Sequence, residues 1–326
     1  RYQRSEKALV LALAEAYLQG VSTRKMKMIT EQLMGKEFSS ASISRFSATL
    51  DAELEYWRER SFTKEYPYVV VDARYESCRV DSKIIDIACL IALGIDSEGH
   101  RHVLGMDTAW SESGDSWERF IGGLKERGLR GVRLFTSDDH PGIHPAIKKY
   151  YPGAVWQRCQ RHFTVNVMDH APRSKRDDLY HRLQTAWDCK EYEDARAVLD
   201  KIADDYREKY PHLADFVSEH AWETLGVYQA APWEHHKRLR TSNMIERVNQ
   251  ELKRRSKVIR IFPNPESCRR LYTALLKEWH EDWAYGKIYL RMDLLWEFET
   301  ENQTQQQERA PAVESNTMKE KKITVA

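Results

Sequence analysis

Residues 68–75 read YVVVDARY, and this stretch decides the fold class. Three consecutive valines make a short apolar run rich in β-branched side chains, which is typical of a strand buried on both faces of a sheet. The run ends on a carboxylate, Asp72. An acid that ends a buried strand lies at the rim of a sheet, where sites are often built. Taken alone, the stretch is explained more simply by a turn that begins at Asp72.

The composition is that of a soluble globular protein. The chain has 326 residues, of which 41% are hydrophobic and 31% charged, a length for about two or three domains. Its net charge of +1 neither favours nor excludes a nucleic-acid partner. Five dispersed cysteines favour reduced thiols inside a cell. We find no signal peptide and no apolar run of the roughly 18 residues that span a membrane, and the start at Arg1 suggests a missing upstream segment.

Residues 1–62 are predicted to form a helical segment that binds DNA. Apolar residues recur at helical spacing, and Gly20 and Gly35 interrupt the pattern. Two helices around a short glycine-containing turn are consistent with a helix-turn-helix. The last helix would present Ser42, Ser44 and Arg45 near its N-terminus, where such helices touch base edges. An ordinary helical hairpin explains the pattern equally well.

Residues 63–162 have the texture of a sheet protein. Apolar, β-rich runs occur at residues 69–71, 84–95, 101–106, 132–136 and 154–157. A turn at residues 94–99, which includes Asp96, indicates a hairpin, and Ser113 can cap a helix that reaches about Lys125. Three early strands followed by alternating helix and strand predict a mixed sheet flanked by helices.

The rest of the chain is predicted to be helical. Residues 163–238 are charged and carry no strand signal, which indicates an all-helical insertion. Residues 239–298 hold a basic helix and one or two further helices that would complete the core. Residues 299–326 are rich in Gln, Glu and Lys and are predicted to be disordered.

Two more acids stand in positions that suit a site. Residues 134–143 read LFTSDDHPGI, so a second apolar strand runs into a carboxylate, Asp138. Two strands of one sheet would then present Asp72 and Asp138 at neighbouring ends, unless Asp138 and Asp139 only cap the next helix. The third acid, Glu246, lies in the first turns of the basic helix.

The charge around Glu246 is strongly positive. Residues 237–260 hold nine basic side chains against two acids, an excess of seven positive charges in a chain whose total is +1. A polyanion bound there would release counterions, so its binding would depend strongly on salt. An acid in such a field stays ionised, as a metal ligand requires.

Two aspartates and a glutamate fit a divalent-metal site. Mg²⁺ prefers carboxylate and water oxygens. Two such ions roughly 3.5–4 Å apart stabilise both the attacking and the leaving oxygen of a phosphodiester. Water or a DNA 3′-hydroxyl would attack, so no nucleophilic side chain is required.

Five blocks in a fixed order carry a family resemblance. They are residues 71–75 (VDARY), 137–142 (SDDHPG), 156–163 (WQRCQRHF), 241–249 (TSNMIERVN) and 261–264 (IFPN). In these blocks, over roughly residues 1–298, the chain resembles the Mutator-type transposases of bacterial insertion sequences, within the DDE transposase group. The resemblance implies an RNase H-like α/β fold interrupted by an all-helical insertion before the last acid. It also implies that Asp72, Asp138 and Glu246 are the catalytic residues and hold two Mg²⁺ or Mn²⁺ ions.

The resemblance further implies a transposase that binds the terminal inverted repeats of its element. Such an enzyme would cleave DNA and join it to target DNA, as a homodimer or larger assembly on the nucleoid in the bacterial cytoplasm, with no membrane partner. Two alternatives remain open: a catalytically silent DNA-binding regulator or domesticated relative, and an RNase H-like nuclease that cuts without joining.

Further residues are candidates for supporting roles. Cys159 and His162 have the spacing of half a zinc site, but no second pair lies at a suitable distance, so we expect them to brace the pocket or contact DNA. Asp139 stands where the family often has a small residue, and we take Asp138 as the ligand. The other supporting candidates are His140 and Asn243, and the candidate DNA contacts on the basic helix are Arg247, Lys253, Arg254, Arg255 and Lys257.

Overall fold

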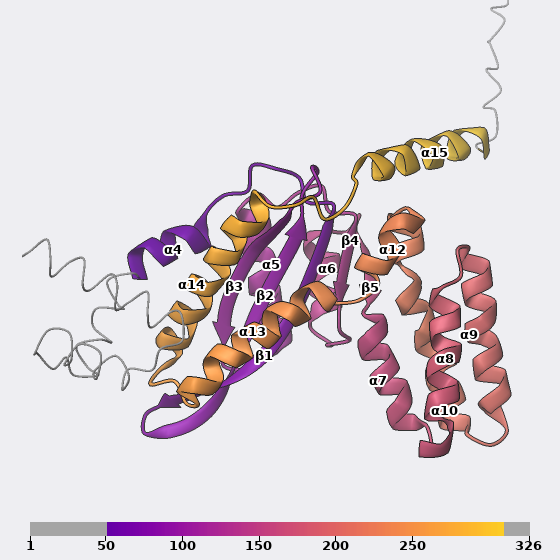
Figure 1. Ribbon diagram of the computed structural model, residues 1–326, viewed down its shortest axis with the longest axis horizontal. Coiled ribbons are helices and arrows are strands. Elements are labelled where there is room, and N and C mark those ends of the chain that lie inside the picture. The colour runs from indigo at the N-terminus through magenta and orange to yellow at the C-terminus, as the bar shows by residue number, and fades with distance from the viewer. Residues whose placement is uncertain (1–50, 310–326) are drawn as a thin grey trace, which may run out of the picture.

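A five-stranded mixed sheet forms the centre of the molecule (Figure 1). The structure is a computed structural model that describes residues 51–309, so Ser42, Ser44 and Arg45 of the predicted DNA-reading helix lie outside the described residues. The strand order is β3-β2-β1-β4-β5; β1 and β3 run antiparallel to β2, and β4 and β5 run parallel to β1. The strands are β1 (Tyr68–Val80), β2 (Lys83–Ile95), β3 (Arg101–Ala109), β4 (Leu134–Ser137) and β5 (Val155–Arg158). The mixed sheet predicted from the apolar runs is confirmed.

The first strand is longer than the sequence predicted. Asp72 lies inside β1, and neither ends the strand nor begins a turn. Pairing with β2 continues as far as Val80 and Lys83, and the two residues between them, Asp81 and Ser82, both have positive φ, 46° and 65°. A two-residue turn of this kind matches the twist of the flanking strands. The polar residues after Asp72 therefore belong to a hairpin that extends beyond the rest of the sheet.

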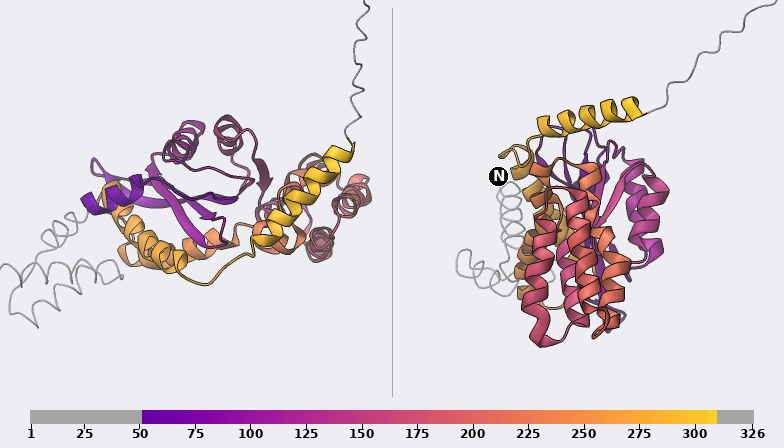
Figure 2. Two further views of the ribbon diagram at one scale, coloured as in Figure 1. Left: turned by 90° about the horizontal axis from the view of Figure 1, so that it is seen from above. Right: turned by 90° about the vertical axis from the view of Figure 1, so that its right-hand side faces the viewer.

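Alternate residues of β1 serve two different cores. Val69 and Val71 pack with α5 (Gly114–Glu126) and α6 (Ile143–Tyr150) on one face. Tyr68 and Val70 pack with α13 (Asn243–Ile259) and α14 (Pro265–Ala284) on the other. Figure 2 shows the sheet between these two helical layers. The valine run is thus buried on both faces as predicted, and the alternation turns Asp72 toward the α13 face.

The helix caps agree only partly with the sequence. Ser113 caps α5 and forms a reciprocal capping box with Ser116, as its position predicted. Helix α6 is preceded by Gly142 and has no side-chain cap. Asp138 and Asp139 therefore do not cap that helix. The turn predicted around Asp96 is confirmed, because its carboxylate accepts hydrogen bonds from the backbone N–H groups of Glu98 and His100.

A second group of helices lies beside the sheet, between β5 and α13 in the chain (Figure 1). It has its own apolar core, which includes Phe163, Leu183, Trp187 and Leu199. Its helices are α7 (Gln160–His170), η1 (Arg173–Lys175), α8 (Arg176–Trp187), α9 (Tyr192–Arg207), α10 (Pro211–His220), η2 (Ala221–Leu225), α11 (Val227–Ala230) and α12 (Trp233–Leu239). The group leads through α12 directly into α13, the helix that carries Glu246.

Two helices frame the described chain. Helix α4 (Asp51–Glu59) packs on α14, with ion pairs from Arg270 and Lys277 to its acids. Helix α15 (Asp293–Arg309) includes residues 299–309, which belong to the segment predicted to be disordered. The five cysteines are free thiols. Within residues 51–309, none of the helices has the length and apolar character needed to cross a membrane.

Candidate active site

Strands β1 and β4 bring Asp72 and Asp138 side by side. The two strands are parallel, and their last paired residues are Val70 and Thr136. Continuing this register by two residues places Asp72 opposite Asp138, at the point where β4 ends. Neighbouring strands lie about 4.8 Å apart, and the charge of Asp138 raises the pKa of Asp72. The first two predicted acids therefore meet at one place on the sheet.

Asp72 is buried, with only 8% of its surface exposed. Its Oδ1 accepts a hydrogen bond from the Ala73 backbone N–H at 3.0 Å, and its Oδ2 accepts one from Asn249 Nδ2 at 2.7 Å. Burial, and then the charge of Asp138, raise the pKa of Asp72 to about 7, against the lowering effects of His162 and the Ala73 N–H. The carboxyl therefore titrates near neutral pH when no cation is present.

Asp138 has an oxygen with no hydrogen-bond donor. Burial raises the pKa of Asp138, while His162 and His140 act to lower it. Its Oδ1 is buried and has no partner among the described residues. A buried carboxylate oxygen without a donor is costly, and a bound cation would remove that cost. The neighbouring residue, Asp139, forms an ion pair with Arg158, with 2.9 Å between its Oδ2 and Arg158 Nη1.

His162 places a positive charge beside the two acids. It lies in the first turn of α7, with Nδ1 buried. The Cys159 side chain and, beyond it, the charges of Asp72 and Asp138 raise the pKa of His162 to about 9, against the opposing effect of burial. The imidazole is therefore mainly protonated at neutral pH and partly neutralises the acids.

Cys159 joins the start of α7 to the start of α13. Its sulfur is buried, accepts a hydrogen bond from the Ser242 backbone N–H at 3.2 Å and lies 3.2 Å from Ser242 Oγ. The contact fixes the N-terminus of the helix that carries Glu246. This contact is compatible with the bracing role expected of Cys159, which stays a prediction.

Helix α13 carries Glu246, three residues before the Asn249 that contacts Asp72. Ser242 Oγ donates a hydrogen bond to Glu246 Oε1 at 3.3 Å, and Arg161 forms an ion pair with Oε2. Asn249 follows Glu246 by three residues, so both side chains lie on one face of the helix. Because Asn249 contacts Asp72, the helix holds Glu246 one turn away from that contact, with Arg161 engaging its carboxylate.

The donor chemistry fits a hard divalent ion. Asp72 and Asp138 supply adjacent carboxylate oxygens, one of them buried without a donor. In residues 51–309 no three His, Cys, Asp or Glu side chains form a ready-made metal cage. Mg²⁺ needs no such cage, because it usually binds one or two carboxylates and keeps several waters.

The other predicted residues are distributed around the site. Asn243 is exposed at the start of α13. His140 Nδ1 accepts a hydrogen bond from the Gly142 backbone N–H at 3.1 Å. On α13, Arg254 and Arg255 both pair with Glu251. The exposed basic residues of that helix are Arg247, Lys253, Arg254 and Lys257.

The sequence analysis missed two residues at the site, Asn249 and Glu112. Asn249 ends the block TSNMIERVN, but nothing in its spacing indicated a contact with Asp72. Glu112 lies immediately before Ser113, the N-cap of α5. The charge of Glu112 raises the pKa of Asp72, and the charge of Asp138 raises the pKa of Glu112. A period of three from Glu246 could have drawn attention to Asn249; Glu112 had no signal of its own.

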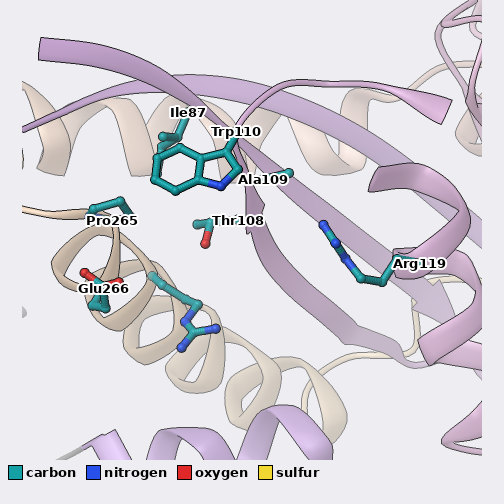
Figure 3. Close-up of a pocket in the computed structure, with 8 residues that line it drawn as sticks. Ile87, Thr108, Ala109, Trp110, Arg119, Pro265 and Glu266 are labelled. Carbon is teal, nitrogen blue, oxygen red and sulfur yellow. The ribbon is translucent and has the colours of Figure 1, made fainter. Parts of the chain in front are cut away.

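A cavity of about 240 Å³ lies elsewhere, between the end of β3 and the start of α14 (Figure 3). Its lining includes Trp110, Arg119 and Glu266, and none of the three predicted acids. The Trp110 side chain is 65% exposed at its rim. The acids therefore lie outside this pocket.

Comparison with known proteins gives a consistent result. The family described as "Transposase, Mutator family" matches residues 1–286. The chain is 46% identical to the "Transposase for insertion sequence element ISRM5" of Rhizobium meliloti, over 90% of this chain and 73% of that protein. It is 41% identical to the transposase for IS406 of Burkholderia multivorans, over 89% and 75%. It is 36% identical to the transposase for IS256 in transposon Tn4001 of Staphylococcus aureus, over 90% and 76%.

Among solved structures, a chain of a simian T-cell lymphotropic virus intasome in complex with PP2A regulatory subunit B56 gamma matches 68% of this chain and 75% of its own length. At 10% identity and a TM-score of 0.19 the likeness carries no weight. The family match spans residues 1–286, a range that includes all three acids. The chain belongs to the Mutator family of transposases.

Proposed function

We propose that this protein is a DDE transposase that moves an insertion element by divalent-metal-dependent DNA cleavage and strand transfer. Asp72, Asp138 and Glu246 are its catalytic carboxylates, and two Mg²⁺ or Mn²⁺ ions are its cofactors. The observation that carries the proposal is the convergence of Asp72, Asp138 and α13, from three distant parts of the chain, at one edge of the β1–β4 pair.

The sheet supports an RNase H-like catalytic core. Three antiparallel strands are followed by two parallel ones in the order β3-β2-β1-β4-β5, with helices on both faces. The helical group between β5 and α13 then corresponds to the insertion before the last acid. Fold alone does not fix function, so the acids carry the assignment.

Each residue of the site has a distinct part in the proposed reaction. Bound metal ions would stabilise the attacking and leaving oxygens of the phosphodiester. Asp72 and Asp138 would hold them, and Asn249 keeps Asp72 oriented. His162 offsets the repulsion between the acids until a cation is present. Glu246 would bind the metal together with Asp72 and Asp138, once its carboxylate has separated from Arg161.

The basic face of α13 supports DNA as the partner. Arg247, Lys253, Arg254 and Lys257 are exposed on the helix that carries Glu246, where phosphates would release counterions. The proposed substrates are the terminal inverted repeats of the element and target DNA, and the proposed location is the nucleoid of the bacterial cytoplasm. Holding two element ends together requires two copies of the chain, so we expect a homodimer or a larger assembly.

The test is incubation of the purified chain with linear DNA that carries its own element ends, in Mg²⁺ or in EDTA. Mg²⁺-dependent joined products support the transposase. Cut but unjoined products would point to a nuclease, and bound, intact DNA in Mg²⁺ would point to a regulator without catalysis. Asp139→Asn is the matched control for Asp138→Asn, because Asp139 adjoins it in the chain and pairs with Arg158 instead.

A further inference from the structure

Glu112 is held in a fixed position between β3 and α5. Its backbone N–H donates a hydrogen bond to Tyr75 Oη at 3.3 Å. Its Oε1 accepts a hydrogen bond from Trp117 Nε1 at 3.0 Å. Trp117 is a fully buried residue of α5, and Tyr75 belongs to β1, three residues after Asp72. The backbone of Glu112 is therefore held by the sheet, through Tyr75, and its carboxylate by the helix, through Trp117.

The same carboxylate faces the candidate site. His140, two residues after Asp138, has its Nδ1 3.9 Å from Glu112 Oε1. Burial, and then the charge of Asp138, raise the pKa of Glu112, and the charge of Glu112 in turn contributes to the raised pKa of Asp72. Only 12% of the Glu112 side chain is exposed. Three acids from separate elements thus lie within one another's field.

A purely structural role does not account for an acid at this position. The indole of Trp117 needs one acceptor, which a neutral glutamine would supply without repelling Asp72 and Asp138. Repulsion among partly buried carboxylates costs stability unless a cation offsets it. Asp138 Oδ1, buried without a partner in the described part of the chain, independently indicates an unmet charge at the same place.

We propose that Glu112 is a fourth acidic residue of the active site, which holds a water of the hydration shell of a divalent ion bound by Asp72 and Asp138. The proposal rests on the metal site of the proposed function. Contact through water agrees with the lack of a preformed cage of three side chains in residues 51–309. Mg²⁺ retains several waters, and each needs an acceptor of fixed position. Glu112 is thus a positioning residue.

Glu112→Gln tests this role, because glutamine keeps the size of the side chain and an acceptor for Trp117. Binding of Mn²⁺ to the full chain without DNA is followed by the electron paramagnetic resonance signal of the free ion. We expect the variant to bind Mn²⁺ about 10–100-fold more weakly, the usual loss when a group that orients a metal's ligands is removed. Glu118→Gln is the control, because Glu118 lies on α5, the helix that follows Glu112, and pairs with Lys149 at the surface.

Stability in EDTA gives a second readout. Loss of the repulsion should make Glu112→Gln at least as resistant to urea as the wild type, and Mn²⁺ should stabilise it less. Unchanged Mn²⁺ affinity of Glu112→Gln, or destabilisation of this variant in EDTA, would overturn the inference. The proposed function would still stand in that case, provided that Asp138→Asn abolishes Mn²⁺ binding. A wild type that binds no Mn²⁺ would overturn the metal site and this inference together.

Discussion

Asn249 Nδ2 donates a hydrogen bond of 2.7 Å to Asp72 Oδ2, across 177 positions of sequence. The carbonyl of Asn249 in turn accepts a hydrogen bond from Arg74 Nη1 at 2.6 Å. Helix α13 is therefore docked onto β1 through both the side chain and the backbone of one residue. Because Glu246 lies one turn earlier on the same face, this docking sets the position of the third acid relative to the first.

Asn249→Ala should loosen that docking. A hydrogen bond to a charged group contributes about 1.5–3 kcal/mol, so the free energy of unfolding at pH 8 in EDTA should fall by about that amount. Urea unfolding provides the measurement. Gln250→Ala is the control, because Gln250 is exposed on the same helix. Equal stabilities of the two variants would mean that the hydrogen bond does not hold α13 in place.

Removing any of the three proposed catalytic acids should abolish chemistry without abolishing DNA binding. Asp72→Asn, Asp138→Asn and Glu246→Gln each keep the shape of the side chain and remove a proposed metal ligand. Loss of several kcal/mol of transition-state stabilisation lowers the rate about a thousandfold or more. Strand joining and filter binding with end DNA, measured on the same preparations, separate the two effects. A variant that joins strands at the wild-type rate in Mg²⁺ would remove that residue from the triad.

Asp72 should make the metal-free protein less stable as the pH rises. Its pKa is raised from 3.8 to about 7 in the fold, by burial first and then by Asp138. The folded state therefore holds the proton more tightly than the unfolded chain, so the stabilisation is complete below about pH 4 and is lost as the pH approaches 7. A shift of about three units corresponds to at most roughly 4 kcal/mol.

Asp72→Asn should remove this dependence between pH 4 and 7, as measured by urea unfolding in EDTA. His162 acts in a higher window: its pKa is raised to about 9, so its contribution is lost only between about pH 6.5 and 9. Identical slopes for wild type and variant from pH 4 to 7 would show that Asp72 does not hold its proton in the fold.

The sequence predicted the sheet but not the contacts between its edge and α13. Runs of β-branched residues favour strands, and Ser113 favours a helix N-terminus, through local interactions. The strands and this helix cap could therefore be predicted from the sequence. The length of β1 was missed because the turn at Asp81 and Ser82 lacks the glycine that usually signals positive φ.

The partners of the acids depend on tertiary packing. Asn249 contacts Asp72 only because α13 packs on the face of β1. Glu112 lies within the electrostatic field of Asp72 and Asp138 only because β3 leads the chain to the start of α5. No local sequence pattern predicts either of these relationships. The resemblance to a family predicted the three acids, and the fold was required to find the residues around them.

Arg161 should compete with metal for Glu246. It pairs with Glu246 Oε2 although 57% of its own side chain is exposed. Arg161→Ala should therefore change stability by less than about 1 kcal/mol, and should strengthen Mn²⁺ binding in the absence of DNA, because a competing cation is removed. Arg182→Ala, which breaks an exposed pair with Asp205 on the helical group, is the control. Weaker Mn²⁺ binding by Arg161→Ala would mean that the arginine helps to assemble the site.

The basic face of α13 should set the salt dependence of DNA binding. The Arg254 side chain is 62% exposed, and both Arg254 and Arg255 contact Glu251 on the same helix. Replacing both by Ala should reduce the slope of log K against log salt by about one for each DNA phosphate that the helix no longer neutralises. Lys201→Ala, an exposed change on α9, should leave the slope unchanged. Since a general loss of folding would weaken binding at every salt concentration alike, a parallel shift without a change of slope would exclude these arginines from the path of the DNA.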